Sequence, residues 1–435
     1  MSTLNLRRRA AKTWVASAIA LMASGAMAQT ATEAELARKL DQLAAELAAV
    51  KAQLIQLQQQ RPLTPAVTAI ANPPPATAPG PVLEPAAGPA TVLTSYGEIN
   101  YNRPTRDSRN AQADLRRFVL GVQHRFDDRT KLVTELEVEH SIASASDAGE
   151  VALEQAYIER QLTPTLALRG GLFLMPVGLL NENHEPTAFF GVERNFVETA
   201  IIPSTWREGG IQLVANFDNG LTAQGGLSTS FNLNKWDATS NEGRESPLGA
   251  IHQELALAKS HDLAVFGALN WRGVPGLLIG GSLFSGQATQ AQTPSAARIT
   301  LWDAHARWTP GRWDLSALYS RAHISGTAAL NTPLVGNPTL IPKSFDGFYA
   351  QAAYKLWQQE DYALLPFVRW EKFNTASAYA DLGAGLTPAA ARSERVITLG
   401  ANFLLSQGVV LKADYQRFRE NADLNRVNLG LGWSF

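Results

Sequence analysis

The sequence has no cysteine and no long apolar segment beyond its first residues. The absence of cysteine excludes disulfide bonds, zinc sites built on thiolates and a cysteine nucleophile. No run of about 18 or more apolar residues follows the N-terminal segment, which excludes a bundle of membrane-spanning helices. Only 18% of the 435 residues are charged, yet the mean hydropathy is -0.11. A membrane β-barrel combines these properties, because its residues alternate between lipid and water.

Basic charge and catalytic motifs are also scarce. A net charge of -1 argues against a nucleic-acid partner, because binding to phosphates needs a clear excess of basic residues. From residue 91 onward, 30 Lys and Arg stand against 34 Asp and Glu. The sequence has no glycine-rich phosphate loop, no nucleophile elbow and no HExxH motif. We therefore predict no catalytic residue, no metal ligand and no cofactor, with a lipid hydrolase kept as an alternative because Ser, His and Asp are all present.

The N-terminus has the features of an export signal. Arg7, Arg8, Arg9 and Lys12 precede the apolar stretch WVASAIALMASG, and the small residues of Ala26-Met27-Ala28 form a cleavage site before Gln29. The alternative, a permanent membrane anchor, is disfavoured because the apolar stretch is too short to span about 30 Å of hydrocarbon. The sequence therefore predicts a cleaved signal peptide over residues 1–28 and export from the cytoplasm.

Residues 33–60 show the heptad spacing of a coiled coil. Their apolar positions follow one another at intervals of four and three, and they are Leu36, Leu40, Leu43, Leu47, Val50, Leu54 and Leu57. So narrow an apolar stripe predicts self-association, although a single helix packed on its own domain would also bury it. Residues 61–90 are rich in proline and alanine and predict an extended linker, which favours the coiled coil.

From residue 91 the pattern changes to short segments in which apolar and polar residues alternate, which predicts β-strands. We expect sixteen strands, at residues 94–104, 114–126, 130–142, 150–162, 165–175, 206–217, 221–234, 262–272, 276–286, 297–308, 312–324, 344–357, 361–373, 393–404, 409–420 and 424–435. Short turns and longer loops alternate strictly between them, which is the layout of an outer-membrane barrel with its short turns in the periplasm. Residues 249–261 are predicted to belong to a loop and to be helical.

The alternation fits either a soluble β-sandwich with an apolar core or a barrel with an apolar outside. Aromatic residues near strand ends, such as Trp302 and Trp308, favour a membrane barrel. The other face carries more charge than a dry core can hold without partners or water. We therefore predict an all-β fold, with residues 91–435 forming a 16-stranded antiparallel transmembrane β-barrel around an aqueous channel.

Fourteen charged or ionisable residues are candidates for the pore lining and constriction. They are Arg117, Arg125, Glu135, Glu137, Glu139, Arg169, Glu182, His184, Glu185, Arg194, Arg207, Asp303, Arg307 and Arg369. Four of them lie between Met175 and Trp206, in a connection of about thirty residues that is far longer than usual. Its many apolar residues would be costly to expose, so we expect this loop to fold inward and narrow the lumen.

One region resembles a known family. Residues 171–210, GLFLMPVGLLNENHEPTAFFGVERNFVETAIIPSTWREGG, resemble the signature region of the phosphate-selective porin O and P family, and SHDLAVFGALNWRG at 260–273 is similar as well. The resemblance implies a homotrimeric outer-membrane channel with the long loop folded into the pore. Phosphate-selective members line the pore with many Arg and Lys, whereas acidic residues outnumber basic ones in this barrel. The resemblance therefore does not carry phosphate selectivity over to this chain.

Together these features predict a porin in the bacterial outer membrane, with its N-terminal segment in the periplasm. We expect passive diffusion of small hydrophilic solutes or ions, with anions such as phosphate among the candidate solutes. The expected partners are the lipid of the outer membrane and further copies of the chain. The alternative is an outer-membrane anchor or scaffold whose coiled coil binds peptidoglycan or a periplasmic partner.

Overall fold

A computed structural model describes residues 38, 39, 42, 45 and 90–435. The predicted signal peptide (1–28) lies outside the described residues, as does the predicted linker (61–90) apart from its last residue. Four residues of the predicted coiled coil (33–60) are described, and these four are helical and exposed. The three N-terminal assignments therefore stay predictions. No helix among the described residues is both long and apolar enough to cross a membrane.

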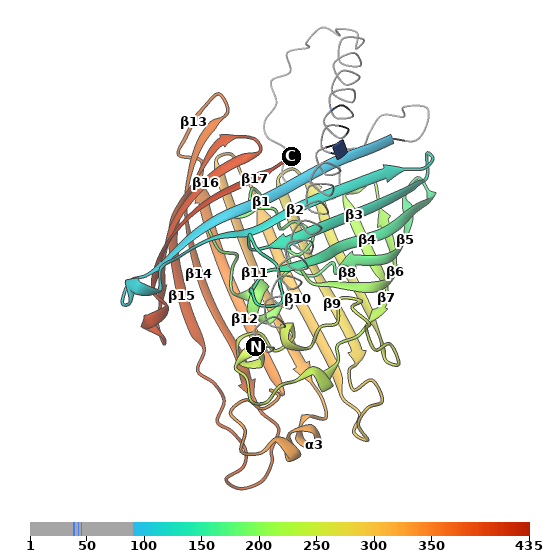
Figure 1. The fold of residues 1–435 in the computed structure, drawn as a ribbon, viewed down its shortest axis with the longest axis vertical. Helices are drawn as coiled ribbons and strands as arrows, with labels where there is room; N and C mark the ends of the chain where they lie inside the picture. The colour runs from blue at the N-terminus through green and yellow to red at the C-terminus, as the bar shows by residue number, and fades with distance from the viewer. Residues whose placement is uncertain (1–37, 40–41, 43–44, 46–89) are drawn as a thin grey trace, which may run out of the picture. The chain divides into compact units, whose positions relative to one another are not determined.

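Residues 90–435 form one antiparallel sheet that closes on itself, because β1 pairs with both β2 and β17 (Figure 1). The strands are β1 (Ala90–Pro104), β2 (Gln112–Arg125), β3 (Thr130–Glu139), β4 (Glu150–Thr163), β5 (Leu166–Leu174), β6 (Arg207–Asn216), β7 (Leu221–Thr229), β8 (Leu263–Val274), β9 (Leu277–Gln287), β10 (Arg298–Trp308), β11 (Trp313–Ile324), β12 (Ser344–Tyr354), β13 (Trp357–Gln359), β14 (Tyr362–Ala378), β15 (Glu394–Ser406), β16 (Val409–Phe418) and β17 (Arg426–Ser434). All neighbouring strands pair in sequence order.

The β12 and β13 strands form one span of the barrel. Both pair with β14, and only Lys355 and Leu356 separate them. The barrel therefore has sixteen spans, which confirms the predicted fold class. Each of the sixteen predicted segments coincides with one span, and the observed ends differ from the predicted ends by at most five residues. Short turns and longer loops alternate as predicted, with the longer loops and α3 at one end of the barrel (Figure 1).

The connections contain only short helical elements. These are η1 (Ser108–Asn110), η2 (Val197–Ile201), η3 (Leu233–Lys235), α2 (Glu242–Glu245), η4 (Gly249–Ile251), α3 (Thr327–Asn331), η5 (Thr332–Leu334) and η6 (Ala422–Leu424). The prediction that residues 249–261 are helical is wrong beyond η4. Glu254, Leu255 and Leu257 have positive φ angles, between 50° and 58°, which no right-handed helix can contain.

The two faces of the barrel wall differ as a membrane barrel requires. Large apolar side chains on the outer face are exposed, for example Ile211 (58%), Leu399 (54%) and Leu429 (50%). Polar and charged side chains that alternate with them face inward and are buried, for example Gln212 and Asn428. The apolar side of the alternation therefore lies outside, which excludes the β-sandwich reading.

Aromatic side chains mark two levels on the outer face. Trp302 and Trp308 both point outward from β10, six residues apart, which corresponds to about 20 Å along a strand. At the level nearer the short turns, the ring of Trp313 contacts that of Tyr354 in a tilted arrangement, with the centroids 4.8 Å apart. At the other level, Trp302 contacts Tyr319 at 5.3 Å. This spacing is close to the height of an apolar band flanked by aromatic girdles.

A hydrophobic core lies inside the barrel rather than between its strands. Trp206, at the start of β6, is 1% exposed, and its ring lies 5.1 Å from that of Phe231 and 4.9 Å from that of Phe284. Met175 and Phe173 belong to the same cluster. Burying one tryptophan removes about 200 Å² of surface from water, which corresponds to about 5 kcal/mol. Burial of Trp206 therefore stabilises the segment that enters the barrel after β5.

Replacing Trp206 with alanine tests this core. We expect the free energy of unfolding to fall by about 3 to 5 kcal/mol, because the change removes buried area and leaves a cavity. The measurement is urea unfolding of the barrel refolded in lipid vesicles. Leu257→Ala is the control, because Leu257 is 99% exposed and should change stability by no more than about 0.5 kcal/mol. Equal effects of the two substitutions would contradict a core at Trp206.

Candidate pore and constriction

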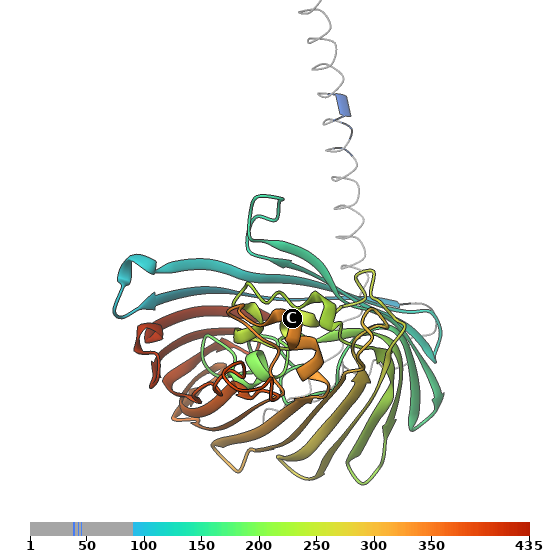
Figure 2. The same ribbon diagram turned by 90° about the horizontal axis from the view of Figure 1, so that it is seen from below.

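Residues 175–206 form an inner loop that leaves β5, passes through the inside of the barrel and returns to β6 (Figure 2). Its two ends are joined at a neck, where the Met175 N–H donates to the Trp206 carbonyl at 2.9 Å. Asn181 completes the neck. Its amide donates to both the Met175 and the Trp206 carbonyls (2.7 and 2.8 Å), and its oxygen accepts from the Trp206 N–H at 2.7 Å. The predicted inward fold of this loop is therefore observed.

The far side of the inner loop is bound to the wall formed by β12 to β17. Wall carboxylates accept from loop backbone, with Asp414 bound to the Val192 N–H and Glu371 to the Phe196 N–H, both at 2.6 Å. Arg369 donates in the opposite sense, to the carbonyls of Phe190 (3.1 Å) and Glu193 (3.2 Å). Backbone groups that no strand can satisfy are thus paired with wall side chains.

Glycine in the wall allows this close approach. A Cβ atom built on Gly432 of β17 would lie 2.4 Å from the Pro186 side chain, and one on Gly347 of β12 would lie 3.1 Å from both Val197 and Ile201. Any other residue at Gly432 would therefore push the loop toward the middle of the lumen.

Glu198 holds the loop to itself. Its carboxylate accepts from the N–H groups of Leu179 (2.6 Å) and Leu180 (2.7 Å) and from the Asn195 amide (2.7 Å), and it also accepts from the Tyr349 hydroxyl of β12 at 3.1 Å. Burial raises the pKa of Glu198, and the hydrogen bonds from Asn195 and from the backbone offset part of that rise. With so many donors around one carboxylate, Glu198 fixes the relative positions of the segments at 179–180 and 195–198.

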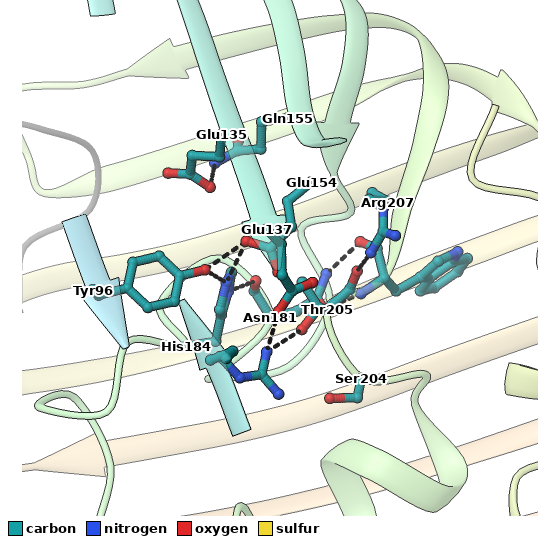
Figure 3. Close-up of polar contacts among 12 residues, drawn as sticks. Tyr96, Glu135, Glu137, Glu154, Gln155, Asn181, His184, Ser204, Thr205 and Arg207 are labelled. Carbon is teal, nitrogen blue, oxygen red and sulfur yellow. Dashed lines mark hydrogen bonds and ion pairs between the residues drawn. The ribbon is translucent and has the colours of Figure 1, made fainter. Parts of the chain in front are cut away.

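The near side of the inner loop meets β1 and β4 through Tyr96, Glu154 and His184, which point toward one another (Figure 3). The Tyr96 hydroxyl donates to Glu154 Oε2 at 2.5 Å and lies 2.6 Å from His184 Nε2. His184 Nε2 is 3.5 Å from Glu154 Oε2, and Nδ1 is 2.9 Å from the Asn181 carbonyl. A carbonyl only accepts, so Nδ1 carries a proton. Because the Tyr96 hydroxyl donates its proton to Glu154, Nε2 of His184 must donate to the Tyr96 oxygen. A ring that donates from both nitrogens is an imidazolium, so this arrangement requires a protonated His184.

Burial opposes protonation of His184, but the charge of Glu154 and the hydrogen bond to it outweigh burial and raise the pKa of His184 above 6.5. Arginine side chains surround this cluster. Arg117 bridges Glu98 and Glu137, each at 3.1 Å, and Arg194 donates to Ser204 (2.8 Å) and Thr205 (2.9 Å). Charges on the four strands β1 to β4 and on the inner loop therefore form one buried network.

Eleven of the fourteen predicted residues form hydrogen bonds or ion pairs with wall strands or loops. Beyond those already placed, Arg169 pairs with Glu159 (2.7 Å), Glu182 accepts from Gln224 (3.0 Å), Arg207 pairs with Glu254 (2.9 Å), Arg307 pairs with Asp314 (2.6 Å), Glu135 accepts from Gln155 (2.6 Å) and Asp303 accepts from the Gly178 N–H (3.2 Å). Arg125 is half-buried in the wall near a short turn.

Glu139 and Glu185 differ from the others, because no ion pair or side-chain hydrogen bond holds either carboxylate within residues 90–435. Glu139 is half-buried and lies directly opposite Glu150 on β4. Two like charges facing each other across strands destabilise the pairing unless water or counter-ions screen them. Glu139 and Glu185 are therefore the predicted residues whose charge no partner within residues 90–435 neutralises, whereas the role of the whole set as a pore lining stays a prediction.

Several residues of the network were missed by sequence reasoning. Glu154 and Tyr96 anchor His184, Asp414 anchors Val192, and Lys412 lies 3.5 Å over the ring of Phe189. Lys412 and Asp414 follow the alternation of β16 and could have been found on that basis. Tyr96 could not, because an aromatic residue in a strand is usually an outward one in such a barrel.

Two cavities flank the inner loop. One, of about 350 Å³, lies toward the short turns between the loop and strands β7 to β14, and Arg272, Arg307 and Glu182 are among its lining residues. The other, of about 220 Å³, lies between β2, β3, β4 and residues 204–254 and is lined by Arg116, Glu139 and Arg207 among others. The loop thus separates two charged spaces inside the barrel.

Comparison with known proteins gives the fold and a distant relative. No family model matches the chain. An uncharacterized protein of Aquifex aeolicus (strain VF5) is 29% identical over 356 residues, which cover 79% of each chain. Among solved structures, OmpF of Salmonella typhi, in complex with daunomycin, is similar with a TM-score of 0.55 and 13% identity, over 79% of this chain and 97% of that one.

Two further solved structures are similar to this chain. The outer membrane channel DcaP of Acinetobacter baumannii matches with a TM-score of 0.51 and 12% identity, over 81% of this chain and 99% of that chain. OprB of Pseudomonas putida matches with a TM-score of 0.50 and 14% identity, over 80% and 94%. At such low identity the similarity concerns the fold, and this chain has the fold of outer-membrane porins.

The His184 cluster should make the stability of the barrel depend on pH. A raised folded-state pKa stabilises the fold fully below the unfolded value of 6.5, and this stabilisation is lost as the pH rises through the folded pKa. We expect wild type to exceed His184→Gln in unfolding free energy at about pH 6, and the difference to shrink by about pH 9. Urea unfolding of both proteins in lipid vesicles measures it. A difference that is constant over this range would show that His184 is neutral.

Proposed function

We propose that the barrel is a channel for the passive diffusion of small hydrophilic solutes and that it has no enzymatic activity. The observation that supports this most is the inner loop, which narrows a charged interior without filling it and leaves cavities of about 350 and 220 Å³ on its two sides. Charged side chains cost desolvation energy unless water reaches them, so charges around these cavities indicate an interior that holds water. A barrel that served only as an anchor would not need such an interior.

The outer face and the strand layout support a place in the outer membrane, surrounded by lipid. The short turns and the N-terminal segment would then face the periplasm, as in other barrels with an even number of strands. We propose a homotrimer and membership in the phosphate-selective porin O and P family on the strength of the resemblance at residues 171–210. Peptidoglycan binding by the predicted coiled coil is a proposal from sequence alone.

Conductance in planar lipid bilayers tests the proposed function. The purified full chain should insert and produce discrete current steps in potassium chloride, because the interior holds water and ions. The alternative, an anchor or scaffold with a closed barrel, predicts insertion without steps. Insertion is checked independently by the resistance of the barrel to protease in vesicles, so that silence cannot be mistaken for failure to insert.

Shortening the inner loop tests whether it forms the constriction. Deletion of residues 183–194 keeps Asn181 at the neck and Glu198 in its own contacts, and it removes the part that lies against β14 to β17. We expect the single-channel conductance to rise about twofold or more, because current scales with the open area at the narrowest point. If the deleted variant inserts and conducts like wild type, the constriction lies elsewhere.

Glu139→Gln tests the exposed carboxylate. Removing an unpaired negative charge from the lumen should shift the ion preference toward anions, seen as a change of reversal potential under a potassium chloride gradient. The shift should shrink at high salt, because screening shortens the reach of the Glu139 charge from about 10 Å at 0.1 M salt to about 3 Å at 1 M. Asp361→Asn is the matched control, because Asp361 lies exposed in a short turn. An unchanged reversal potential in Glu139→Gln would remove this residue from the pore lining.

A further inference from the structure

The cavity on the short-turn side of the inner loop has two unlike walls. The loop contributes apolar side chains, among them Leu179, Leu180 and Phe189. Leu179 and Leu180 are half-buried, so parts of both face the cavity. The opposite wall is the inner face of β8 to β14 and carries three arginines but no carboxylate among the cavity-lining residues of that wall. Glu182, on the inner loop, is the one acidic side chain among the residues that line the cavity.

The pairing register places the three arginines along one row that runs across the strands. Arg307 of β10 lies opposite Ser316 of β11, which lies opposite Gln351 of β12, which lies opposite Arg369 of β14. On the other side, Arg307 lies opposite Leu278 of β9. Arg272 of β8 falls at the level of Leu278, because Trp271 pairs with Ile279 and Val274 with Leu277.

The three guanidinium groups differ in what remains free. Arg369 is 2% exposed and donates to the Glu371 carboxylate and to the carbonyls of Phe190 and Glu193. It therefore anchors the inner loop to the wall. Arg307 forms a two-point pair with Asp314, at 3.1 and 2.6 Å. The Arg272 side chain forms no ion pair and no hydrogen bond with any residue of the described part of the chain, whereas its backbone N–H donates to the Gly220 carbonyl at 2.8 Å. The charge of Glu182, on the inner loop, acts on the guanidinium without a hydrogen bond between the two groups. Arg272 lines the cavity and is half-buried, so its guanidinium has donors that a ligand in the cavity can use.

We infer that this cavity is a binding site for organic carboxylates with an apolar body, in which Arg272 binds the carboxylate and Leu179 and Leu180 contact the body. The inference rests on the proposed channel function and names the class of solute that the channel would favour. A planar guanidinium matches a carboxylate with two parallel hydrogen bonds. Arg307 lies two strands from Arg272, about 10 Å along the wall, but its pair with Asp314 leaves Arg272 as the cation that binds the anion.

The apolar wall separates this class from inorganic anions. Phosphate is hydrated on all sides, so contact with leucine side chains would remove bound water without forming hydrogen bonds in its place. A carboxylate with an apolar body removes apolar area from water on both partners and keeps its charge at Arg272. A cavity of about 350 Å³ is also in the range of pockets that bind small molecules.

Blocking of the channel by three anions tests the site. Benzoate, gluconate and inorganic phosphate are added on the short-turn side of wild-type channels in a planar bilayer, and the concentration that halves the potassium chloride current is measured. Benzoate should half-block at a concentration about tenfold lower than gluconate, which has the same charge without the apolar body. Equal values for benzoate and gluconate, or stronger block by phosphate, would overturn the inference.

Variants then locate the site. Arg272→Gln should raise the half-blocking concentration of benzoate about tenfold, because a charge-assisted hydrogen bond is lost. Leu180→Asn should raise it for benzoate and leave gluconate unchanged. Arg321→Gln is the matched control, because Arg321 is an exposed residue on the outward face of β11, opposite Trp302. If Arg272→Gln blocks like wild type, benzoate does not bind at this cavity.

A second measurement separates this inference from the proposed function. Should wild type insert without current steps, the channel function fails, but benzoate binding to detergent-solubilised protein can still be measured by titration calorimetry. Heat of binding that Arg272→Gln abolishes and Arg321→Gln retains would then support the site in a barrel that does not conduct. Absence of heat from wild type would overturn the site whether or not the barrel conducts.

Discussion

The pairing of β1 with β17 is the constraint on which the rest of this structure depends. Ser95 and Phe435 exchange both of their backbone hydrogen bonds, at 3.0 and 2.9 Å, so the ladder closes up to the last residue of the chain. A closed sheet has no edge with unpaired N–H and C=O groups, and this is what allows its apolar face to meet lipid. It also fixes an inside. Every polar residue that alternates with an outward leucine or valine is forced into a confined space.

That confined space explains how the charged residues are used. Most of them bind one another or the backbone of the inner loop, because a loop inside a barrel has peptide groups that no strand can pair. Asp414, Glu371 and Arg369 satisfy such groups from the wall, and Glu198 does so from within the loop. A carboxylate that accepts backbone N–H groups replaces the water that those groups would otherwise need. Most of the charged side chains inside the barrel therefore stabilise the fold, and few remain unpaired.

The strands could be predicted from the sequence, because their signal is local. Two-residue alternation and turn residues recur within each segment, and the closed register then follows from sequence order. The contacts of the inner loop could not be predicted, since Tyr96 and His184 are 88 residues apart and Val192 and Asp414 are 222 apart. Glu154 adds a further difficulty. It lies at a bulge in β4, where the alternation of inward and outward side chains shifts by one residue. Alternation counted from one end of the strand places Glu154 inside the barrel, and alternation counted from the other end places it outside.

The difference between charged side chains that are paired within the fold and those that are unpaired also affects the ion preference of the proposed channel. Acidic residues outnumber basic ones from residue 91 onward, 34 to 30, which by itself suggests a preference for cations. Charge that is paired inside the wall produces little field in the lumen, so the count is the wrong quantity. In the proposed channel a solute would meet the remaining unpaired charge, which includes Glu139 on the side of the longer loops and Arg272 on the side of the short turns. These two have opposite signs and lie on opposite sides of the inner loop. A channel built in this way can favour a particular solute at one cavity while its net charge stays close to balance.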